Sequence, residues 1–116
     1  MSKNKATYLI LAMIAAGLAY GHAKIVATVP ADGDYVAPPE TLVLTFDSEV
    51  RLTGVELHTA DGDPVDLGTV DEQKARSFVI RVPRPLAAGG YYLVWRSIAA
   101  DKHFSTGEFF FTVIED

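Results

Sequence analysis

Two histidines and one aspartate are the residues of this chain best suited to binding a metal ion. The chain has three histidines, His22, His58 and His103, and Asp101 lies two residues before His103 in the stretch ADKHF. Residues i and i+2 of an extended segment project to the same side, so the Asp101 carboxylate and the His103 imidazole are expected to converge. The pair predicts half of a metal site; the alternative is a histidine that only pairs with an acid in a solvated loop.

His22 becomes a second candidate ligand because it directly follows a predicted signal peptide, residues 1–21. Residues 1–7 carry two lysines and no acid, residues 8–18 are almost wholly apolar, and small residues stand three and one positions before His22. This pattern is typical of a secretory signal, and the apolar run is shorter than the roughly 20 residues of a membrane-spanning helix. Cleavage after Gly21 would place His22 at the amino terminus of the working protein, which we expect to be periplasmic.

A free amine on His22 would add two nitrogen ligands from one residue, because the amine and the ring Nδ1 can close a chelate ring around a metal ion. Together with Asp101 and His103, this gives a mixed nitrogen and oxygen set. Such a set in a tetragonal arrangement suits Cu(II), whereas Cu(I) prefers sulfur. The chain has no cysteine, and both methionines fall within residues 1–21, so the mature protein has no sulfur ligand. Zinc, which takes the same ligands in a tetrahedron, is the competing metal.

Another cleavage position would change the site. A cut after Ala19 would leave Tyr20, Gly21 and His22 at the start of the chain. Their amine, amide and imidazole nitrogens would form a claw for Cu(II) or Ni(II) that needs neither Asp101 nor His103.

The composition limits the mature protein to one small acidic domain, residues 22–116. These 95 residues are enough for a single hydrophobic core. Removal of residues 1–21, which hold two lysines and no acid, lowers the formal net charge from −5 to −7. We therefore expect no nucleic-acid partner, because phosphate binding needs a basic surface.

The mature chain alternates apolar and polar residues in short runs, which predicts strands rather than helices. The predicted strands cover residues 24–29, 42–46, 53–59, 65–70, 78–82, 91–98 and 108–114, with turn-forming stretches such as PADGD, ADGDP and PRPLAAGG between them. About seven strands at this spacing predict an all-β, seven-stranded antiparallel Greek-key β-sandwich of immunoglobulin-like type. Leu86, Gly89 and Tyr91 fit a tyrosine corner, in which the Tyr hydroxyl bonds to nearby backbone.

The stretches HAKIVATVPADGDYV, LVLTF and AAGGYYLVWRSIAADKHFSTGEFFFTV resemble the CopC family of periplasmic copper-binding proteins. The most specific parts are the histidine after the signal, the turn at Pro30–Gly33, the strand at Tyr92–Arg96 and the D-x-H-x-x-x-G segment at Asp101–Gly107. The resemblance implies a small seven-stranded Greek-key sandwich that binds Cu(II) through His22, Asp101 and His103. It also implies a monomer that serves copper resistance or delivers copper to a CopD-like inner-membrane transport protein.

Three features of the chain depart from the family pattern. The methionine-rich Cu(I) segment of some relatives has no counterpart, so the chain resembles a Cu(II)-only member. The usual Phe-Ser-Glu-Pro-Val-like turn after the second strand appears here as Phe46-Asp47-Ser48-Glu49-Val50. Its glutamate is therefore one position later than in the family pattern. The usual Gly-His-Pro reads Lys102-His103-Phe104, which keeps the histidine but adds a cation and a bulky ring; if the segment is extended, Lys102 points away from its two neighbours.

Other residues have simpler interpretations. One strand face carries Tyr91, Leu93 and Trp95, which we expect to pack in the core. Arg96 lies on the opposite face and could pair with an acid. His58 has Glu56 two residues earlier on the same face, and we expect it to lie on the surface of a strand. An oxidative copper enzyme would need a larger sandwich with a substrate surface, so we expect binding without turnover and no substrate. The remaining alternative is an immunoglobulin-like structural or interaction module with no metal role.

Overall fold

The computed structural model describes residues 23–71 and 73–115, and these residues form strands, turns and loops without a helix. None of them therefore lies in a helix that could cross a membrane. The predicted signal peptide and His22 lie outside the described residues. The strands, in chain order, are β1 (Ile25–Val29), β2 (Tyr35–Val36), β3 (Thr41–Thr59), β4 (Pro64–Val65), β5 (Ala75–Arg81), β6 (Gly89–Ala99) and β7 (Phe104–Val113).

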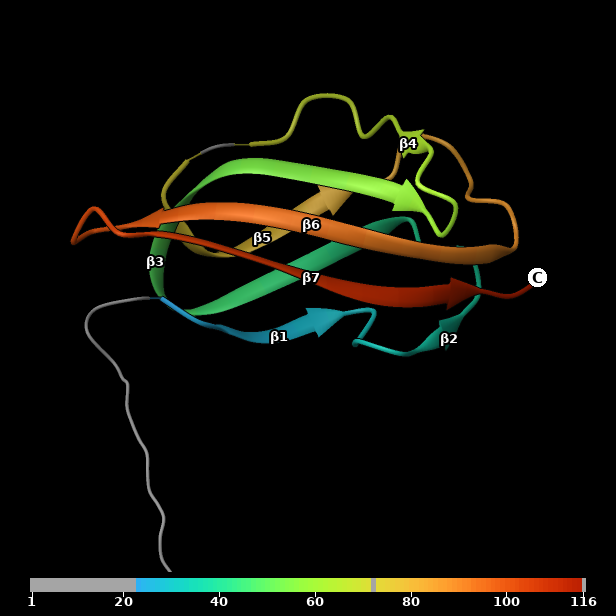
Figure 1. Cartoon of the computed structure of the whole chain (residues 1–116), viewed down its shortest axis with the longest axis horizontal. Helices are drawn as coiled ribbons and strands as arrows, with labels where there is room; N and C mark the ends of the chain where they lie inside the picture. Colours follow the sequence, from blue (N-terminus) through green and yellow to red (C-terminus); the bar gives the residue numbers. More distant parts are fainter. Residues whose placement is uncertain (1–22, 72, 116) are drawn as a thin grey trace, which may run out of the picture.

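The long strand β3 belongs to two layers of the fold. Its first part, up to Phe46, pairs with β1 on one side and β5 on the other. Its second part, from Val50 onward, pairs with β6 and β4, and β6 continues the sheet through β7 to β2. β3 therefore turns a corner between residues 46 and 50, and the seven strands curl around one core (Figure 1).

A bulge in β3 keeps both of its parts facing that core. Leu44, Phe46 and Leu52 are buried at even-numbered positions, but the register with β6 shifts between Leu52 and Gly54, and the next fully buried residue is the odd-numbered Leu57. An extra residue on one strand reverses the side to which the following side chains point. The bulge thus explains how one strand of 19 residues contributes to two layers.

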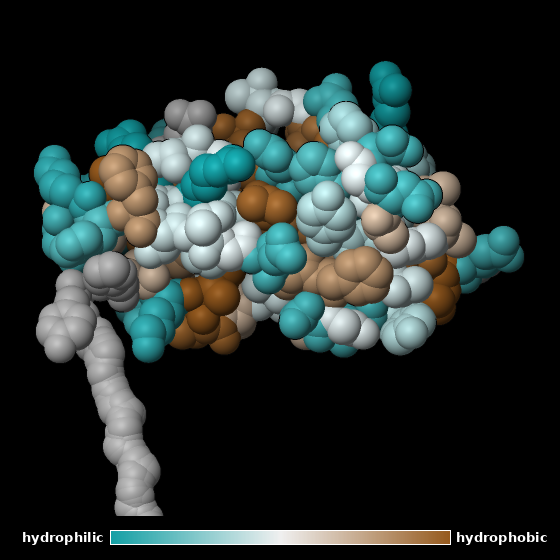
Figure 2. Space-filling model, viewed as in Figure 1, coloured by the Kyte–Doolittle hydropathy of each residue, from teal (hydrophilic) through white to brown (hydrophobic). Residues whose placement is uncertain are grey.

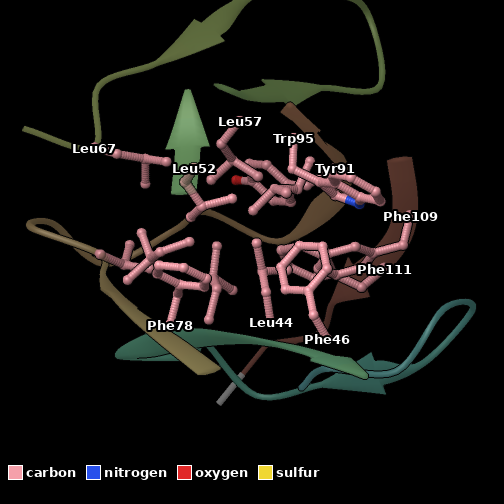
Figure 3. Packing of buried hydrophobic residues seen from close by; sticks show 14 of the residues in the cluster. Leu44, Phe46, Leu52, Leu57, Leu67, Phe78, Tyr91, Trp95, Phe109 and Phe111 are labelled. Carbon is pink, nitrogen blue, oxygen red and sulfur yellow. The ribbon is translucent and has the colours of Figure 1, made fainter. Parts of the chain in front are cut away.

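The core lies between the two layers and is rich in aromatic rings (Figure 3). Phe46 of β3 meets the indole of Trp95 of β6 edge to face, with ring centroids 5.2 Å apart. Phe111 of β7 stacks against Tyr91 at 5.7 Å. The sequence prediction that Tyr91, Leu93 and Trp95 face the core is confirmed, since each is at most 6% exposed. The all-β sandwich prediction is confirmed as well.

Some predicted details are wrong. The stretch 65–70 forms a strand only at Pro64–Val65, because its remaining residues run through a loop with Gly68 at a φ of 70°. The expected turn from Phe46 to Val50 is continuous strand, so the two strands predicted at 42–46 and 53–59 are one. The sheet is also not wholly antiparallel, because the short β2 runs parallel to β7.

Candidate metal centre

A tight hairpin between β6 and β7 carries Asp101 and His103. The amide of Ala99 donates to the carbonyl of His103 at 3.0 Å, and the amide of Lys102 donates to the carbonyl of Ala99 at 2.9 Å. Lys102 has a φ of 73°. A three-residue hairpin loop commonly ends in a residue of this left-handed conformation, which glycine adopts most easily.

Asp101 and His103 interact at two points within this hairpin. The amide of His103 donates to Oδ1 of Asp101 at 3.0 Å, and Nδ1 of the His103 ring lies 2.9 Å from Oδ2 of the same carboxylate. The side chains are 30% and 56% exposed, respectively. The predicted convergence of the pair is confirmed. Its expected cause is wrong, because a turn closed by the aspartate, not an extended segment, brings the two together.

The turn also changes the environment predicted for Lys102. The prediction assumes an extended strand, in which successive side chains point to opposite sides. Lys102 has a left-handed backbone conformation instead, so that rule does not apply to it. The next residue, Phe104, is 72% exposed. The hairpin therefore carries a carboxylate, a cation, an imidazole and an exposed aromatic ring on four consecutive residues, Asp101 to Phe104.

The first described residues of the chain lie at the same end as the hairpin. The Lys24 amide donates to Oδ1 of Asp47 at 2.9 Å, the Asp47 amide donates to the Lys24 carbonyl at 2.9 Å, and Ala23 is 4% exposed. Three residues beyond Asp47, Val50 pairs with Ala99 at the end of β6.

β1 pairs with the first part of β3 and β6 with the second part. β5 pairs with β3 both in the first part and at Val50, so it occupies one edge of β3, and β1 and β6 lie one after the other along the other edge. Ile25 at the start of β1 is opposite Phe46, and Ala99 at the end of β6 is opposite Val50. The two strand ends are therefore four positions of β3 apart, or roughly 13 Å along an extended strand. Figure 1 shows β1 beginning at the end of the molecule from which the β6–β7 hairpin projects.

The structure describes two of the three predicted ligands. Within residues 23–71 and 73–115, no three His, Asp or Glu side chains gather closely enough to hold a metal ion. The third predicted ligand, His22, is joined directly to the buried Ala23 but lies outside the described part of the chain. The structure thus brings Asp101 and His103 together and does not describe His22.

His58 lies away from this site, as a surface residue of β3, which agrees with its sequence interpretation. It pairs with Tyr92 near the start of β6, whereas Asp101 follows the end of that strand. Nε2 of His58 lies 3.1 Å from Oε1 of Glu56, and Nη1 of Arg96 donates to the other Glu56 oxygen at 3.2 Å. These hydrogen bonds and the charge of Arg96 lower the pKa of the Glu56 carboxyl from its ordinary value. The suggestion that Arg96 pairs with an acid is confirmed.

Two features predicted from the sequence, the tyrosine corner and the turn at Pro30–Gly33, stabilise the fold. The Tyr91 hydroxyl donates to the Ala87 carbonyl at 2.6 Å, which confirms the tyrosine corner. In the turn after Pro30, the amide of Gly33 donates to the carbonyl of Phe110 at 2.6 Å. The amide of Phe110 in turn donates to the Asp32 carboxylate at 2.9 Å. The turn is thereby fixed to β7.

Comparison with known proteins gives one consistent result. The family model for the CopC domain matches residues 25–114. The chain is 28% identical to copper resistance protein C of Xanthomonas campestris pv. juglandis over 114 residues, which is 90% of each chain. It is 30% identical to copper resistance protein C of Escherichia coli over 113 residues, or 89% of this chain and 90% of the relative.

A solved structure agrees with these sequence matches. The crystal structure of PcoC, a methionine-rich copper resistance protein from Escherichia coli, superposes with a TM-score of 0.68 at 31% identity, covering 80% of this chain and 99% of that one. The sequence resemblance is therefore confirmed by the family match, by curated relatives and by the fold. The chain belongs to the CopC family.

Proposed function

We propose that the mature protein is a periplasmic copper-resistance protein that binds one Cu(II) ion through the amine and Nδ1 of His22, together with Asp101 and His103. The observation that carries this proposal is the pairing of Asp101 and His103 at 2.9 Å on a hairpin next to the start of β1. Only the corner of β3, residues 46–50, separates the start of β1 from the end of β6. A ligand at the new amino terminus would therefore have a short distance to cover to reach Asp101 and His103.

The chemistry of the available ligands fits Cu(II). Three nitrogens and a carboxylate oxygen are ligands that a tetragonal Cu(II) ion accepts, and Cu(II) heads the affinity order of the divalent metals. The relative of known structure is described as methionine-rich, whereas the only methionines here are Met1 and Met13. Both lie in the predicted signal peptide, so a Cu(I) site built on thioether sulfur has no residues to form it.

Asp101 can serve such a site in two ways. Its carboxylate can bind the metal, or it can hold the His103 ring and backbone in place for binding. Carboxylates that orient a ligating imidazole typically raise metal affinity 10- to 100-fold. In both cases the protein chelates the ion, and we propose binding without turnover. A CopD-like inner-membrane transport protein would then receive the copper.

The decisive experiment moves the amine away from His22. Intact mass of the secreted protein first establishes whether cleavage occurs after Gly21 or after Ala19. One alanine is then added before His22, and Cu(II) affinity is measured by chelator competition. The matched control carries the extra alanine after Asp116.

We expect the amino-terminal addition to lower affinity by orders of magnitude and the carboxyl-terminal addition to have no effect. Equal affinities in both proteins would remove the amine from the site. Tight binding that survives His103→Ala would instead favour the claw of Tyr20, Gly21 and His22.

A further inference from the structure

A hollow opens next to the candidate metal hairpin, where three segments of the chain converge. Val50, in the corner of β3, pairs with Ala75 at the start of β5 and with Ala99 at the end of β6. The hollow measures about 240 Å³, and Val50, Ile98 and Ala99 form its apolar floor. It lies at the end of the molecule where the β6–β7 hairpin projects, and Figure 2 shows hydrophilic side chains gathered at that end.

Charged side chains surround this floor, and three of the four are positive. Arg51 comes from β3, Lys74 from the residue before β5 and Lys102 from the hairpin, with Glu49 as the one carboxylate. Within residues 23–71 and 73–115, none of these four makes an ion pair within 4.0 Å. The whole chain has only 10 basic residues against 15 acidic ones. Three cations without an ion pair to another described residue therefore gather around one hollow, which locally reverses the negative net charge of the protein.

Lys102 faces this hollow although it follows Asp101 directly and precedes His103. The left-handed turn at φ 73° separates its direction from that of the paired carboxylate and imidazole. Glycine would adopt this backbone conformation more easily than lysine. The lysine side chain adds a positive charge at the rim of the hollow that glycine could not supply.

We propose that this hollow binds a small oxyanion ligand, one that carries carboxylate or phosphate groups, beside the candidate copper site. Lysine and arginine side chains that converge from separate segments can donate charge-assisted hydrogen bonds to such oxygens, and a concave surface of one charge sign concentrates ions of the other. Glu49 opposes only one of the three positive charges. Arg51, Lys74 and Lys102 are the residues that would contact the anion.

Oxyanion binding does not require copper. If the chain also binds Cu(II) as proposed above, an anion here would offset the charge of Lys102 next to the metal, so that each ligand would favour the other. That consequence rests on the proposed function. The test therefore uses metal-free protein, whose result is independent of the copper proposal.

The experiment is an NMR titration of the metal-free secreted protein at constant ionic strength, with sodium phosphate in one arm and sodium citrate in the other. We expect saturable shifts of the amides at residues 49–51, 74–75 and 98–102. Saturation in one arm only would identify phosphate or carboxylate as the preferred group. Linear shifts without saturation in both arms would overturn the proposal.

A matched pair of variants separates a specific site from net charge. Lys74→Gln with Lys102→Gly removes two charges at the hollow and leaves the turn in its preferred residue type. Arg81→Gln with Arg84→Gln removes two charges near the opposite end of β5. We expect the first variant to bind the anion at least tenfold more weakly and the second to bind within twofold of the wild type. Equal weakening in both would mean that only general electrostatic attraction is present, and the proposed site would be wrong.

Discussion

The indole of Trp95 lies directly over Gly107, its partner across the β6–β7 ladder. A Cβ atom on residue 107 would stand 2.6 Å from Cζ2 of that ring. Trp95 is 6% exposed and is fixed on its other side by Phe46, so it has little room to move away. We expect Gly107→Ala to destabilise the protein by about 1–3 kcal/mol, as overpacking of cores does, and to lower Tm by several degrees in thermal unfolding.

Gly54 is the matched control for this substitution. It also lies in a strand, but its added Cβ would meet the guanidinium of Arg96 at 3.1 Å, and that group is the end of a flexible side chain. Gly54→Ala should therefore lower Tm much less than Gly107→Ala does. If Gly107→Ala were as stable as Gly54→Ala, the close packing of Trp95 would not be a constraint on the hairpin that carries Asp101 and His103.

The hydroxyl of Tyr91 provides a second test, through its 2.6 Å hydrogen bond to the Ala87 carbonyl. Tyr91→Phe keeps the ring that stacks on Phe111 but leaves that carbonyl without this donor. A typical hydrogen bond contributes about 1 kcal/mol, so urea unfolding should show a loss of about this size. Tyr92→Phe, next to it on the outer face, should lose much less. Equal losses would indicate that the tyrosine corner adds nothing beyond packing.

The fold was largely predictable from the sequence because alternation is a local signal. Leu93, Trp95 and Tyr91 could be assigned to the core from their spacing alone. The corner of β3 could not be predicted in this way. Asp47, Ser48 and Glu49 are residue types common in turns, but the strand continues through them, between the part that pairs with β1 and the part that pairs with β6. The bulge after Leu52 likewise depends on the register with β6, which no short stretch of sequence specifies.

The candidate site was predictable to the extent that its parts are close in the sequence. Asp101 and His103 were found from their spacing and meet as expected, although through a turn. The hollow beside them was missed, because Arg51, Lys74 and Lys102 come from three segments that only the corner of β3 brings together. An arrangement of this kind requires the strand pairings and has no sequence pattern of its own.

The lowered pKa of Glu56 predicts a pH-dependent contribution to stability. Hydrogen bonds from His58 and Arg96 favour the charged carboxylate in the folded state. A carboxyl group with a lowered folded-state pKa stabilises the protein above its unfolded pKa, and that contribution is lost as the pH falls through the folded value. The wild type should therefore be more stable than Glu56→Gln at neutral pH, and the difference should shrink below about pH 4.5. Urea unfolding of both proteins at a series of pH values measures this difference in the free energy of unfolding.

Glu108→Gln is the control for that series, since Glu108 is an exposed glutamate of β7 without an ion pair to another described residue. Its stability relative to the wild type should vary little over the same pH range. A difference between the wild type and Glu56→Gln that stayed constant with pH would show that the contacts of Glu56 act through packing and not through its charge.

Two substitutions of Asp101 separate its role in the hairpin from the role in metal binding that we propose for it. Asp101→Asn retains an oxygen that can accept from the His103 amide, but it loses the charge and places an amide or an uncharged oxygen near Nδ1. Asp101→Ala removes both contacts, which now measure 3.0 and 2.9 Å. We expect the asparagine variant to keep the stability of the wild type in thermal unfolding and to bind Cu(II) at least tenfold more weakly. The alanine variant should lose stability as well as affinity. If the asparagine variant bound Cu(II) as tightly as the wild type, the carboxylate charge would have no part in the site, and only the position of His103 would matter.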